Sequence, residues 1–246
     1  MSWPFLWLIS QIYCHTHLPL KLSIIIPAYN EQTTIGKLLP YLLCHTSAAT
    51  ELVVADGGST DATRSIAAGF GVRVLHCKRK GRAFQMNEAA AVANGDVLYF
   101  LHADTFPPES FEELIQEAGR QGNGSGCFRL RFDAPHWFLR ANAWFTRFDV
   151  DAIRFGDQSL FVQRELFVQA GGFNERLLLL EDQEIVKRLR RLAPFVVLPH
   201  AVVTSARKYK QHGIYRLQAG YFLIYTMYKL GISQQRLVQV YKWLLG

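Results

Sequence analysis

Two places in the chain carry carboxylates where they could act on a ligand. Asp104 follows the apolar run 97–101, whose β-forming residues are typical of a strand buried on both faces. Glu181 and Asp182 open a segment with helical spacing of apolar residues. In open α/β sheets, ligands bind beyond the carboxyl ends of the strands. A carboxylate there can bind a hard divalent cation, and a second one can accept the proton of a reacting hydroxyl.

Each of these carboxylates also has a structural interpretation. Asp104 could do no more than cap a helix that is expected to begin near Pro108. Glu181 and Asp182 could simply complement the positive end of their own helix. If one of them is the general base, Asp182 is favoured over Glu181. A helix N-terminus should lower the pKa of Asp182 and keep it ionised, while Glu181 should point about a quarter-turn away.

Polar residues near other expected strand ends could hold a nucleotide diphosphate. Lys80, Arg82 and Gln85 offer cations and an amide donor, and Gly81 allows a close backbone approach. A bare basic run of this kind more often faces solvent. Asp56 could accept the imide N–H of a uracil-like base, although an Asp before Gly-Gly more commonly just forms a turn.

Two further candidates follow the last clear strand, residues 195–198. Arg207 could contact the donor or the acceptor. His200 could contact a metal ion or a phosphate, and a histidine satisfied within the fold is an equally good interpretation.

Composition limits the classes of partner. The chain has 246 residues, 50% of them hydrophobic, with a net charge of +7 and a pI near 9.3. This charge suits nucleotides or anionic lipids, and no nucleic-acid-binding motif accompanies it, so nucleic acid is not expected as a partner. The four cysteines are widely spaced, which favours neither a disulfide framework nor a zinc site and fits a reducing cytosol.

The segments that must position these residues alternate between strand and helix. Strands are predicted at 22–26, 52–55, 72–77 and 97–101, and amphipathic or Ala-rich helical patterns lie between them. Pro40 lies inside the first helical pattern and should kink it. This alternation predicts βαβ units on a parallel sheet, and therefore an α/β fold.

The chain divides into three parts on this interpretation. Residues 1–21 form an N-terminal extension whose apolar run, residues 3–9, is far shorter than the roughly 20 apolar residues needed to cross a bilayer. Residues 22–210 form the catalytic domain, with a nucleotide-binding half to about residue 121 and an acceptor half after the Gly-rich break at 121–126. Residues 211–246 are helical and have two open interpretations: an apolar face with cations nearby could contact a membrane peripherally, or the same face could pack onto the catalytic domain. The face consists of Leu237, Tyr241, Leu244 and Leu245, and the cations are Lys229, Arg236 and Lys242.

Three phrases of the sequence together resemble a known family. Residues 23–31 (SIIIPAYNE), 54–61 (VADGGSTD) and 181–182 (ED) resemble the signature set of family-two glycosyltransferases with the GT-A fold. The resemblance runs from about Lys21 to the end. Residues 101–104, 156–158 and 171–173 are similar to the bacterial branch often named for arsenosugar biosynthesis. The usual metal motif is Asp-x-Asp, and here His102 occupies its first position.

The resemblance implies a Rossmann-like nucleotide-binding half with a mixed, mainly parallel central sheet, followed by C-terminal helices. It implies that the catalytic residue is Asp182, with Glu181 beside it. The nucleotide-binding set it implies, together with the basic residues above, is Pro27, Ala28, Tyr29, Glu31, Asp56, Gly57, Lys80, Gly81, Arg82 and Gln85. The donor and acceptor set is His102, Ala103, Gly156, Asp157, Gln158 and Arg207, and the metal candidates are Asp104 and His200.

The expected function is therefore an inverting glycosyltransferase. It would use Mg²⁺ or Mn²⁺ to move a sugar from a nucleotide-diphosphate sugar, with a UDP-sugar favoured, to an acceptor hydroxyl that could be lipid-linked. The expected location is the cytoplasm, including the inner face of the cell membrane. Two alternatives stay open: a nucleotide-sugar-binding protein without turnover, and a sugar-nucleotide pyrophosphorylase. The latter would need a longer Gly-rich loop with Arg where residues 27–31 stand.

Overall fold

The computed structural model describes residues 20–150 and 156–245. The strands are β1 (Leu22–Ala28), β2 (Glu51–Asp56), β3 (Arg73–His76), β4 (Val97–Phe100), β5 (Thr105–Phe106), β6 (Ser125–Phe132), β7 (Leu160–Gln163) and β8 (Phe195–Thr204). The first helices are α1 (Gln32–Cys44), α2 (Thr63–Gly69), α3 (Arg82–Val92), α4 (Phe111–Arg120) and α5 (Trp137–Phe145). The later ones are the 3₁₀ turn η2 (Gly156–Gln158), α6 (Arg164–Gln169), α7 (Glu181–Leu192), α8 (Arg207–His212), α9 (Ile214–Lys229) and α10 (Gln234–Leu245).

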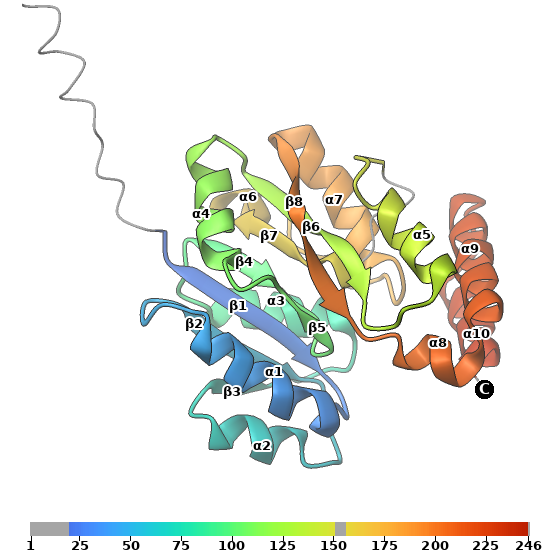
Figure 1. Cartoon of the computed structure of the whole chain (residues 1–246), viewed down its shortest axis with the longest axis horizontal. Helices are drawn as coiled ribbons and strands as arrows, with labels where there is room; N and C mark the ends of the chain where they lie inside the picture. Colours follow the sequence, from blue (N-terminus) through green and yellow to red (C-terminus); the bar gives the residue numbers. More distant parts are fainter. Residues whose placement is uncertain (1–19, 151–155, 246) are drawn as a thin grey trace, which may run out of the picture.

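All of these strands belong to one mixed sheet, in the order β3-β2-β1-β4-β7-β6-β8-β5. The first half of the chain supplies the parallel block β3-β2-β1-β4. β7 is antiparallel to β4 and to β6, while β6 and β8 are again parallel. The predicted α/β fold with a mixed, mainly parallel sheet is confirmed (Figure 1).

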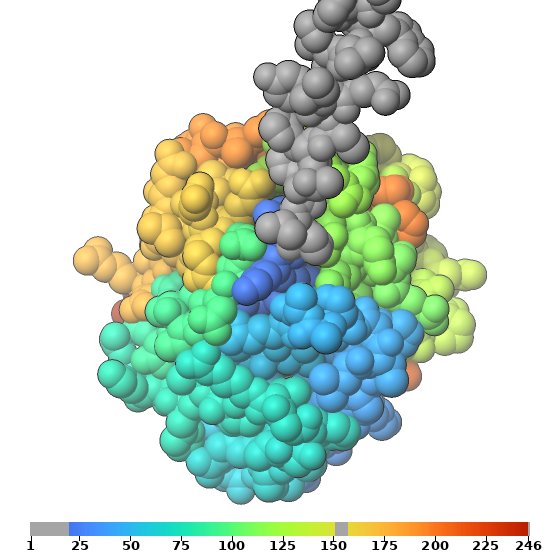
Figure 2. Space-filling model, turned by 90° about the vertical axis from the view of Figure 1, so that its left-hand side faces the viewer, coloured from blue at the N-terminus to red at the C-terminus, as the bar shows by residue number. Residues whose placement is uncertain are grey.

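Helices cover both faces of this sheet, because alternate strand residues point to opposite sides. Ile24 and Ile26 of β1 belong to a core cluster with residues of α1, α2 and α4. Ile25, between them, belongs to a second cluster with residues of α3, α6 and α7. Figure 2 shows the side of the molecule where the start of β1 lies between the surfaces of the two halves.

β4 is buried along its whole length, as its apolar sequence predicts. The chain then turns at residues 102–104 and forms the short strand β5, which pairs with β8. The next helix begins only at Phe111, with Ser110 before it. Asp104 therefore does not cap a helix, and the structural interpretation of this residue is wrong.

The C-terminal helices α9 and α10 pack against each other as a hairpin. A Cβ atom added to Gly220 would overlap the side chain of Leu244, so the glycine allows the two helices to approach closely. Leu237 and Leu244 are buried in this contact with Ile224. The prediction that this face of α10 contacts a membrane is therefore wrong, because α9 already covers it.

Two other predictions concern the ends and bends of the chain. Pro40 lies inside α1, as predicted. The predicted N-terminal extension falls on residues 1–19, outside the described residues, apart from its last two positions. Among the helices that the structure describes, none is both long enough and apolar enough to cross a bilayer.

Candidate active site

The loops after β1 and β2 are bonded to each other and form the first wall of the site. Asn30, which has a positive φ of 55°, donates its backbone N–H to the Ser59 hydroxyl and accepts the Thr60 N–H on its side chain. Pro27 and Ala28, at the end of β1, pair with Ala55 and Asp56 at the end of β2. The strand ends thus form a fixed floor beneath the two loops.

Asp56 shapes this floor from below. Its side chain is 0% exposed, and its carboxylate accepts the backbone N–H groups of Gly58 and Ser59. Arg64 and His76 lie 3.8 and 3.4 Å from the same oxygen. Asp56 therefore stabilises the turn through the Gly58 and Ser59 N–H groups, and its contact with a nucleotide base stays a prediction.

Gln85 lies deeper than predicted. Its amide donates to the carbonyl oxygens of Ala28 and Ala55, each at 2.8 Å, and the residue is 4% exposed. A Cβ on Gly57 would lie 2.9 Å from this amide, so only glycine fits there. Gln85 therefore joins the ends of β1 and β2, and the prediction that it meets a diphosphate directly is not what the structure shows.

Tyr29 and Lys80 face each other across the open side of the floor. The Lys80 ammonium lies 3.4 Å from the Tyr29 hydroxyl and 4.9 Å from the centre of its ring. Tyr29 is half-exposed, so both groups are accessible to a ligand. Gly81, next along the chain, precedes the first residue of α3.

Arg82 points away from Lys80 and towards α7. Its guanidinium lies 3.5 Å from a Glu181 oxygen, 3.9 Å from an Asp182 oxygen and 3.4 Å from Nε2 of His102. Arg82 therefore contacts the carboxylates of the catalytic candidate while Lys80 contacts Tyr29, and their contact with a diphosphate stays a prediction.

The loop after β4 supplies His102 and Asp104. Nδ1 of His102 lies 3.1 Å from a carboxylate oxygen of Asp157, which comes from η2. Desolvation lowers the pKa of His102, but the hydrogen bond to Asp157 and the charges of Asp157 and Asp182 together outweigh it, and the net pKa is raised. Desolvation acts to raise the pKa of Asp157. The hydrogen bond from His102 and the positive charges of His102, Lys208 and Arg82 outweigh desolvation and lower this pKa to about 2. The two groups therefore favour the charged form of each other.

Asp104 lies in a site with excess negative charge. Burial raises the pKa of its carboxyl, and the charges of Asp157 and Glu31 raise it further. Its side chain makes no hydrogen bond or ion pair with the described residues, while its backbone oxygen accepts the Ser205 N–H. Its carboxylate oxygens are thus available to a cation.

Glu31 and Arg207 connect the two halves of the chain. The Arg207 guanidinium lies 3.2 and 3.1 Å from the two Glu31 oxygens, and Thr34 also donates to this carboxylate. Both predicted residues are therefore near the site, at the ends of β1 and β8. Their direct mutual contact makes them a link between loops.

Glu181 and Asp182 begin α7 immediately after Leu180, which has a positive φ of 66°. Glu181 is buried against Arg82, with a side chain 2% exposed, whereas that of Asp182 is 19% exposed. Burial raises the pKa of Asp182 to about 6, and the Glu181 charge adds to this effect. The prediction of a lowered pKa is wrong, because desolvation and the adjacent carboxylate outweigh the helix terminus.

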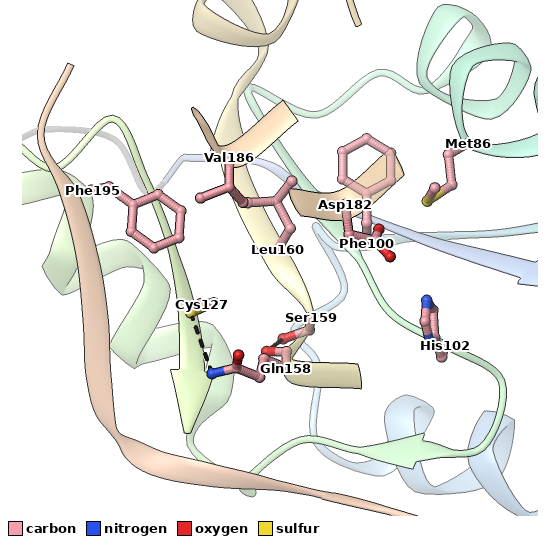
Figure 3. A pocket seen from close by; sticks show the side chains of 10 residues that line it. All are labelled: Met86, Phe100, His102, Cys127, Gln158, Ser159, Leu160, Asp182, Val186 and Phe195. Carbon is pink, nitrogen blue, oxygen red and sulfur yellow. Dashed lines mark hydrogen bonds between the residues drawn. The ribbon is translucent and has the colours of Figure 1, made fainter. Parts of the chain in front are cut away.

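A mostly apolar hollow lies beside Asp182 and His102. Figure 3 shows these two side chains at one end of it and Phe195 at the other. Gln158 is buried in its wall and donates to the carbonyl oxygen of Phe128. Gly156 opens the same turn, η2, and Ala103 is buried in the loop beside His102.

His200 is not near the predicted metal site. It is exposed and lies in the irregular part of β8 where the pairing with β6 shifts register. Thr204, which pairs with Thr105 next to Asp104, is four residues further along the strand. At about 3.3 Å per residue that separation is roughly 13 Å. His200 therefore cannot share a cation with Asp104, and this prediction is wrong.

Sequence reasoning missed Lys208 and assigned Tyr241 only to a membrane-contacting face, not to the site. The Lys208 ammonium lies 3.5 Å from the Tyr241 hydroxyl, and its charge lowers the pKa of both Asp104 and Asp157. The position of Lys208 next to Arg207 was a signal that could have identified it. Tyr241 belongs to α10, and its role depends on how the hairpin folds back, which no local pattern reveals.

Comparison with known proteins shows which family this chain belongs to. The sequence profile described as Glycosyl transferase family 2 matches residues 23–172, more than half of the chain. The chain belongs to glycosyltransferase family 2. A PGL/p-HBAD biosynthesis glycosyltransferase from Mycobacterium bovis is 30% identical over 200 residues, covering 76% of this chain and 77% of that protein.

Other glycosyltransferases match shorter parts of the chain. An uncharacterized glycosyltransferase from Haemophilus influenzae is 26% identical over 68% of this chain and 61% of its own length. The glycosyltransferase YibD of Escherichia coli is 32% identical over 44% of this chain, and the match spans only about a third (35%) of that protein. Family membership is thus shown, although several relatives are longer than the region they share.

Solved structures confirm the GT-A fold. A mannosyltransferase from Pyrobaculum calidifontis, solved with GDP-Man and Mn²⁺, superposes with a TM-score of 0.69 at 18% identity, covering 87% of this chain and 65% of that one. Glucosyl-3-phosphoglycerate synthase from Mycobacterium tuberculosis, solved with Mn²⁺, UDP and glucosyl-3-phosphoglycerate, gives a TM-score of 0.60 at 18% identity, covering 87% and 81%.

Proposed function

We propose that this family-2 protein is an inverting glycosyltransferase that moves a sugar from a nucleotide-diphosphate sugar to an acceptor hydroxyl. The observation that carries the proposal is the position of Asp182 relative to the loop after β4. Arg82 contacts both Asp182 and His102, and His102 contacts Asp157. The candidate base Asp182 therefore lies together with a guanidinium and a histidine at the loop that follows β4. Transfer of a sugar from a diphosphate oxygen to a hydroxyl oxygen needs a base for the hydroxyl proton and positive charge for the departing diphosphate.

The donor nucleotide is proposed to lie over the ends of β1 and β2, in the half that ends near residue 121. Tyr29 offers an exposed ring and Lys80 a cation for the base, ribose or diphosphate. A UDP-sugar is favoured, and the neighbours solved with UDP or GDP-Man show that both kinds of nucleotide occur on this fold. α1 begins at Gln32, which leaves no room for the long Gly-rich loop of a pyrophosphorylase.

Asp104 is proposed to hold a divalent cation, Mg²⁺ or Mn²⁺. Its buried carboxylate with a raised pKa, close to Asp157 and Glu31, is an oxygen site that positive charge would stabilise. No group of three or more potential ligands surrounds a common point among the described residues. A site with one carboxylate fits a cation whose other ligands are donor phosphates and water. Such a cation would stabilise the charge on the departing diphosphate.

Asp182 is proposed to remove the proton of the acceptor hydroxyl. The hydroxyl oxygen attacks the anomeric carbon, the bond to the diphosphate breaks with its electron pair, and the proton goes to a carboxylate oxygen of Asp182. One displacement of this kind inverts the anomeric configuration. A carboxylate with a pKa of about 6 is well matched to this task at neutral pH, because it is ionised before reaction and basic enough to accept a proton.

The acceptor is proposed to be a hydroxyl on a lipid-linked molecule, reached from the cytoplasm at the inner face of the membrane. The exposed aromatic residues of the acceptor half support this placement, because such rings prefer the interface between bilayer and water.

The function is tested by donor hydrolysis and transfer. The protein is incubated with UDP-, GDP- and dTDP-sugars, with and without Mn²⁺, and with a lipid extract as acceptor source. Release of the nucleoside diphosphate that depends on acceptor supports transfer. Binding of a donor without any release would favour a binding protein without turnover, and activity that requires pyrophosphate would favour a pyrophosphorylase.

A further inference from the structure

Three helices of the acceptor half expose large aromatic side chains to solvent. We call the outward residues Trp137 and Trp144 of α5, Tyr215 and Phe222 of α9, and Trp243 of α10 the aromatic surface. Their side chains are between 47% and 71% exposed. Trp137 and Trp144 are seven residues apart, as are Tyr215 and Phe222, so each pair lies on one face of its helix. Soluble surfaces rarely expose so many rings without a partner.

The helices that carry these rings lie side by side. The inner faces of α5 and α9 share a core cluster through Leu139 and Leu217, which turns the opposite faces outward. The ring of Tyr215 lies 5.0 Å from that of Phe138, next to Trp137. Arg216 joins α9 to α10, with its guanidinium 5.9 Å from the Trp243 ring. Figure 1 shows α5, α9 and α10 at the same end of the molecule.

The charge of the chain is concentrated in the same region. Residues 185–246 contain eleven Lys and Arg and no Asp or Glu, because all 20 acidic residues lie before position 185. The remainder of the chain is therefore slightly acidic, and the net charge of +7 arises entirely from the last quarter. Arg216, Lys229, Arg236 and Lys242 are exposed on α9 and α10, and Arg140 is exposed on α5.

We propose that the aromatic surface docks on an anionic lipid bilayer. Trp and Tyr are the residues that prefer the headgroup region, because their rings are apolar and their N–H or O–H groups are polar. Each nearby Lys or Arg adds attraction to anionic lipids. A second protein with an apolar patch would not by itself explain a segment of 62 residues without a single acid. The headgroup region of an anionic bilayer accommodates the rings, and its phosphates attract the cations.

The docked orientation would bring the bilayer close to the acceptor side of the candidate site. Tyr241 of α10 contacts Lys208. The positive charge of Lys208 acts to lower the pKa of the Asp104 and Asp157 carboxyls, so this contact connects α10 to the site. The side chain of Gln234, at the start of α10, accepts the N–H groups of Leu178 and Leu179, just before α7 and Asp182. The hairpin that meets the lipid thus also holds the loop that presents the proposed base.

Vesicle flotation of the full chain tests the proposal. The probes are vesicles of phosphatidylcholine alone and of phosphatidylcholine with about one-third phosphatidylglycerol. The double variant Phe222→Glu with Trp243→Glu should bind the anionic vesicles at least about tenfold more weakly. The matched control is Val168→Glu with Phe70→Glu, which adds the same charge at exposed apolar positions on α6 and after α2. It should change binding by less than about twofold.

The outcomes separate lipid from other occupants and from the proposed enzymatic function. Binding to anionic vesicles that weakens with salt and with the first double variant supports the proposal. Absence of binding to anionic vesicles, or equal binding by both double variants, overturns it. So does a wild-type dimer in sedimentation that only Phe222→Glu with Trp243→Glu dissociates, without vesicle binding. Since the vesicles contain no donor or sugar acceptor, Asp182→Asn should still bind them even if transfer fails.

Discussion

Nδ1 of His102 lies 3.1 Å from Oδ1 of Asp157, and this contact explains how a histidine can occupy the position where the metal motif of the family usually has an aspartate. The site already contains Asp104, Asp157 and Asp182. Each additional carboxylate would raise the pKa of the others, as Asp157 does for Asp104. A histidine bonded to Asp157 instead offsets one of these charges, so that Asp104 can stay ionised for a cation.

The His102–Asp157 pair should make stability depend on pH. Because the folded pKa of His102 is raised, its stabilising contribution is fully present below the unfolded value of about 6.5 and is lost as pH rises through the folded pKa. Because the folded pKa of Asp157 is lowered, its contribution is fully present above the unfolded value of about 3.9 and is lost progressively as the pH falls towards about 2. The Tm difference between wild type and His102→Asn should therefore be larger at about pH 5.5 than at about pH 9.

The control for this measurement is His200→Asn, an exposed histidine outside the site. Its Tm difference from wild type should be small and nearly independent of pH. A His102→Asn difference that stays constant across the same range would show that the pair contributes nothing as an ion pair.

Gln85 should contribute to the free energy of unfolding, because its amide bonds the ends of β1 and β2. Gln85→Leu leaves the buried carbonyl oxygens of Ala28 and Ala55 without their donor, which should cost about 1–3 kcal/mol in the free energy of unfolding. Gln121→Leu, at the exposed end of α4, is the matched control and should change stability by less than about 0.5 kcal/mol. Denaturant unfolding measures both, and equal values for the two variants would refute the structural role.

Much of the fold could be predicted from the chain because local patterns carry it. The apolar run at 97–101 indicated the buried strand β4, and the helical spacing around Ile35 and Leu38 indicated α1. Asp104, Asp157 and Asp182 were identified from motifs and a family resemblance, and the structure brings them near one another, as the pKa effects of Asp157 on the other two show.

Long-range packing explains what sequence could not provide. The amphipathic pattern of Leu237 and Leu244 was correct, but the sequence did not show that α9 would cover this face. The raised pKa of Asp182 depends on burial and on the orientation of Glu181, which a rule about helix termini does not include. His200 was expected to follow a strand ending at residue 198, yet β8 continues to Thr204, so that four strand residues separate His200 from the end of β8 that lies near Asp104.

Asp104 should determine how strongly the binding affinity for the donor depends on a divalent metal ion. Asp104→Asn should weaken binding of a nucleotide-diphosphate sugar at least about tenfold in Mn²⁺ and make the residual affinity insensitive to EDTA. Asp96→Asn, just before the opposite end of β4, should behave like wild type. Calorimetric titration of donor with and without EDTA measures this. An Asp104→Asn protein with wild-type affinity and wild-type response to EDTA would remove the metal assignment.

Glu181 should adjust the pH dependence of turnover without supplying the base. With a pKa of about 6 for Asp182, kcat should fall as pH drops below 6, approaching about tenfold per pH unit. Glu181→Gln removes a charge that raises this pKa, so the acid limb should move to lower pH. Glu184→Gln, on the same helix and paired with Arg188, should leave the limb in place. A limb that moves to higher pH in Glu181→Gln would contradict this electrostatic account.

The most direct test of the proposed mechanism is the turnover of Asp182→Asn at saturating donor and acceptor, measured with its donor affinity. The substitution keeps the shape of the side chain and removes the proton acceptor. We expect kcat to fall about 10²–10⁴-fold while the donor Kd stays within about twofold, and Glu181→Gln to cost much less at neutral pH. Near wild-type turnover by Asp182→Asn would contradict the assignment of Asp182 as the base and, with it, the proposed mechanism.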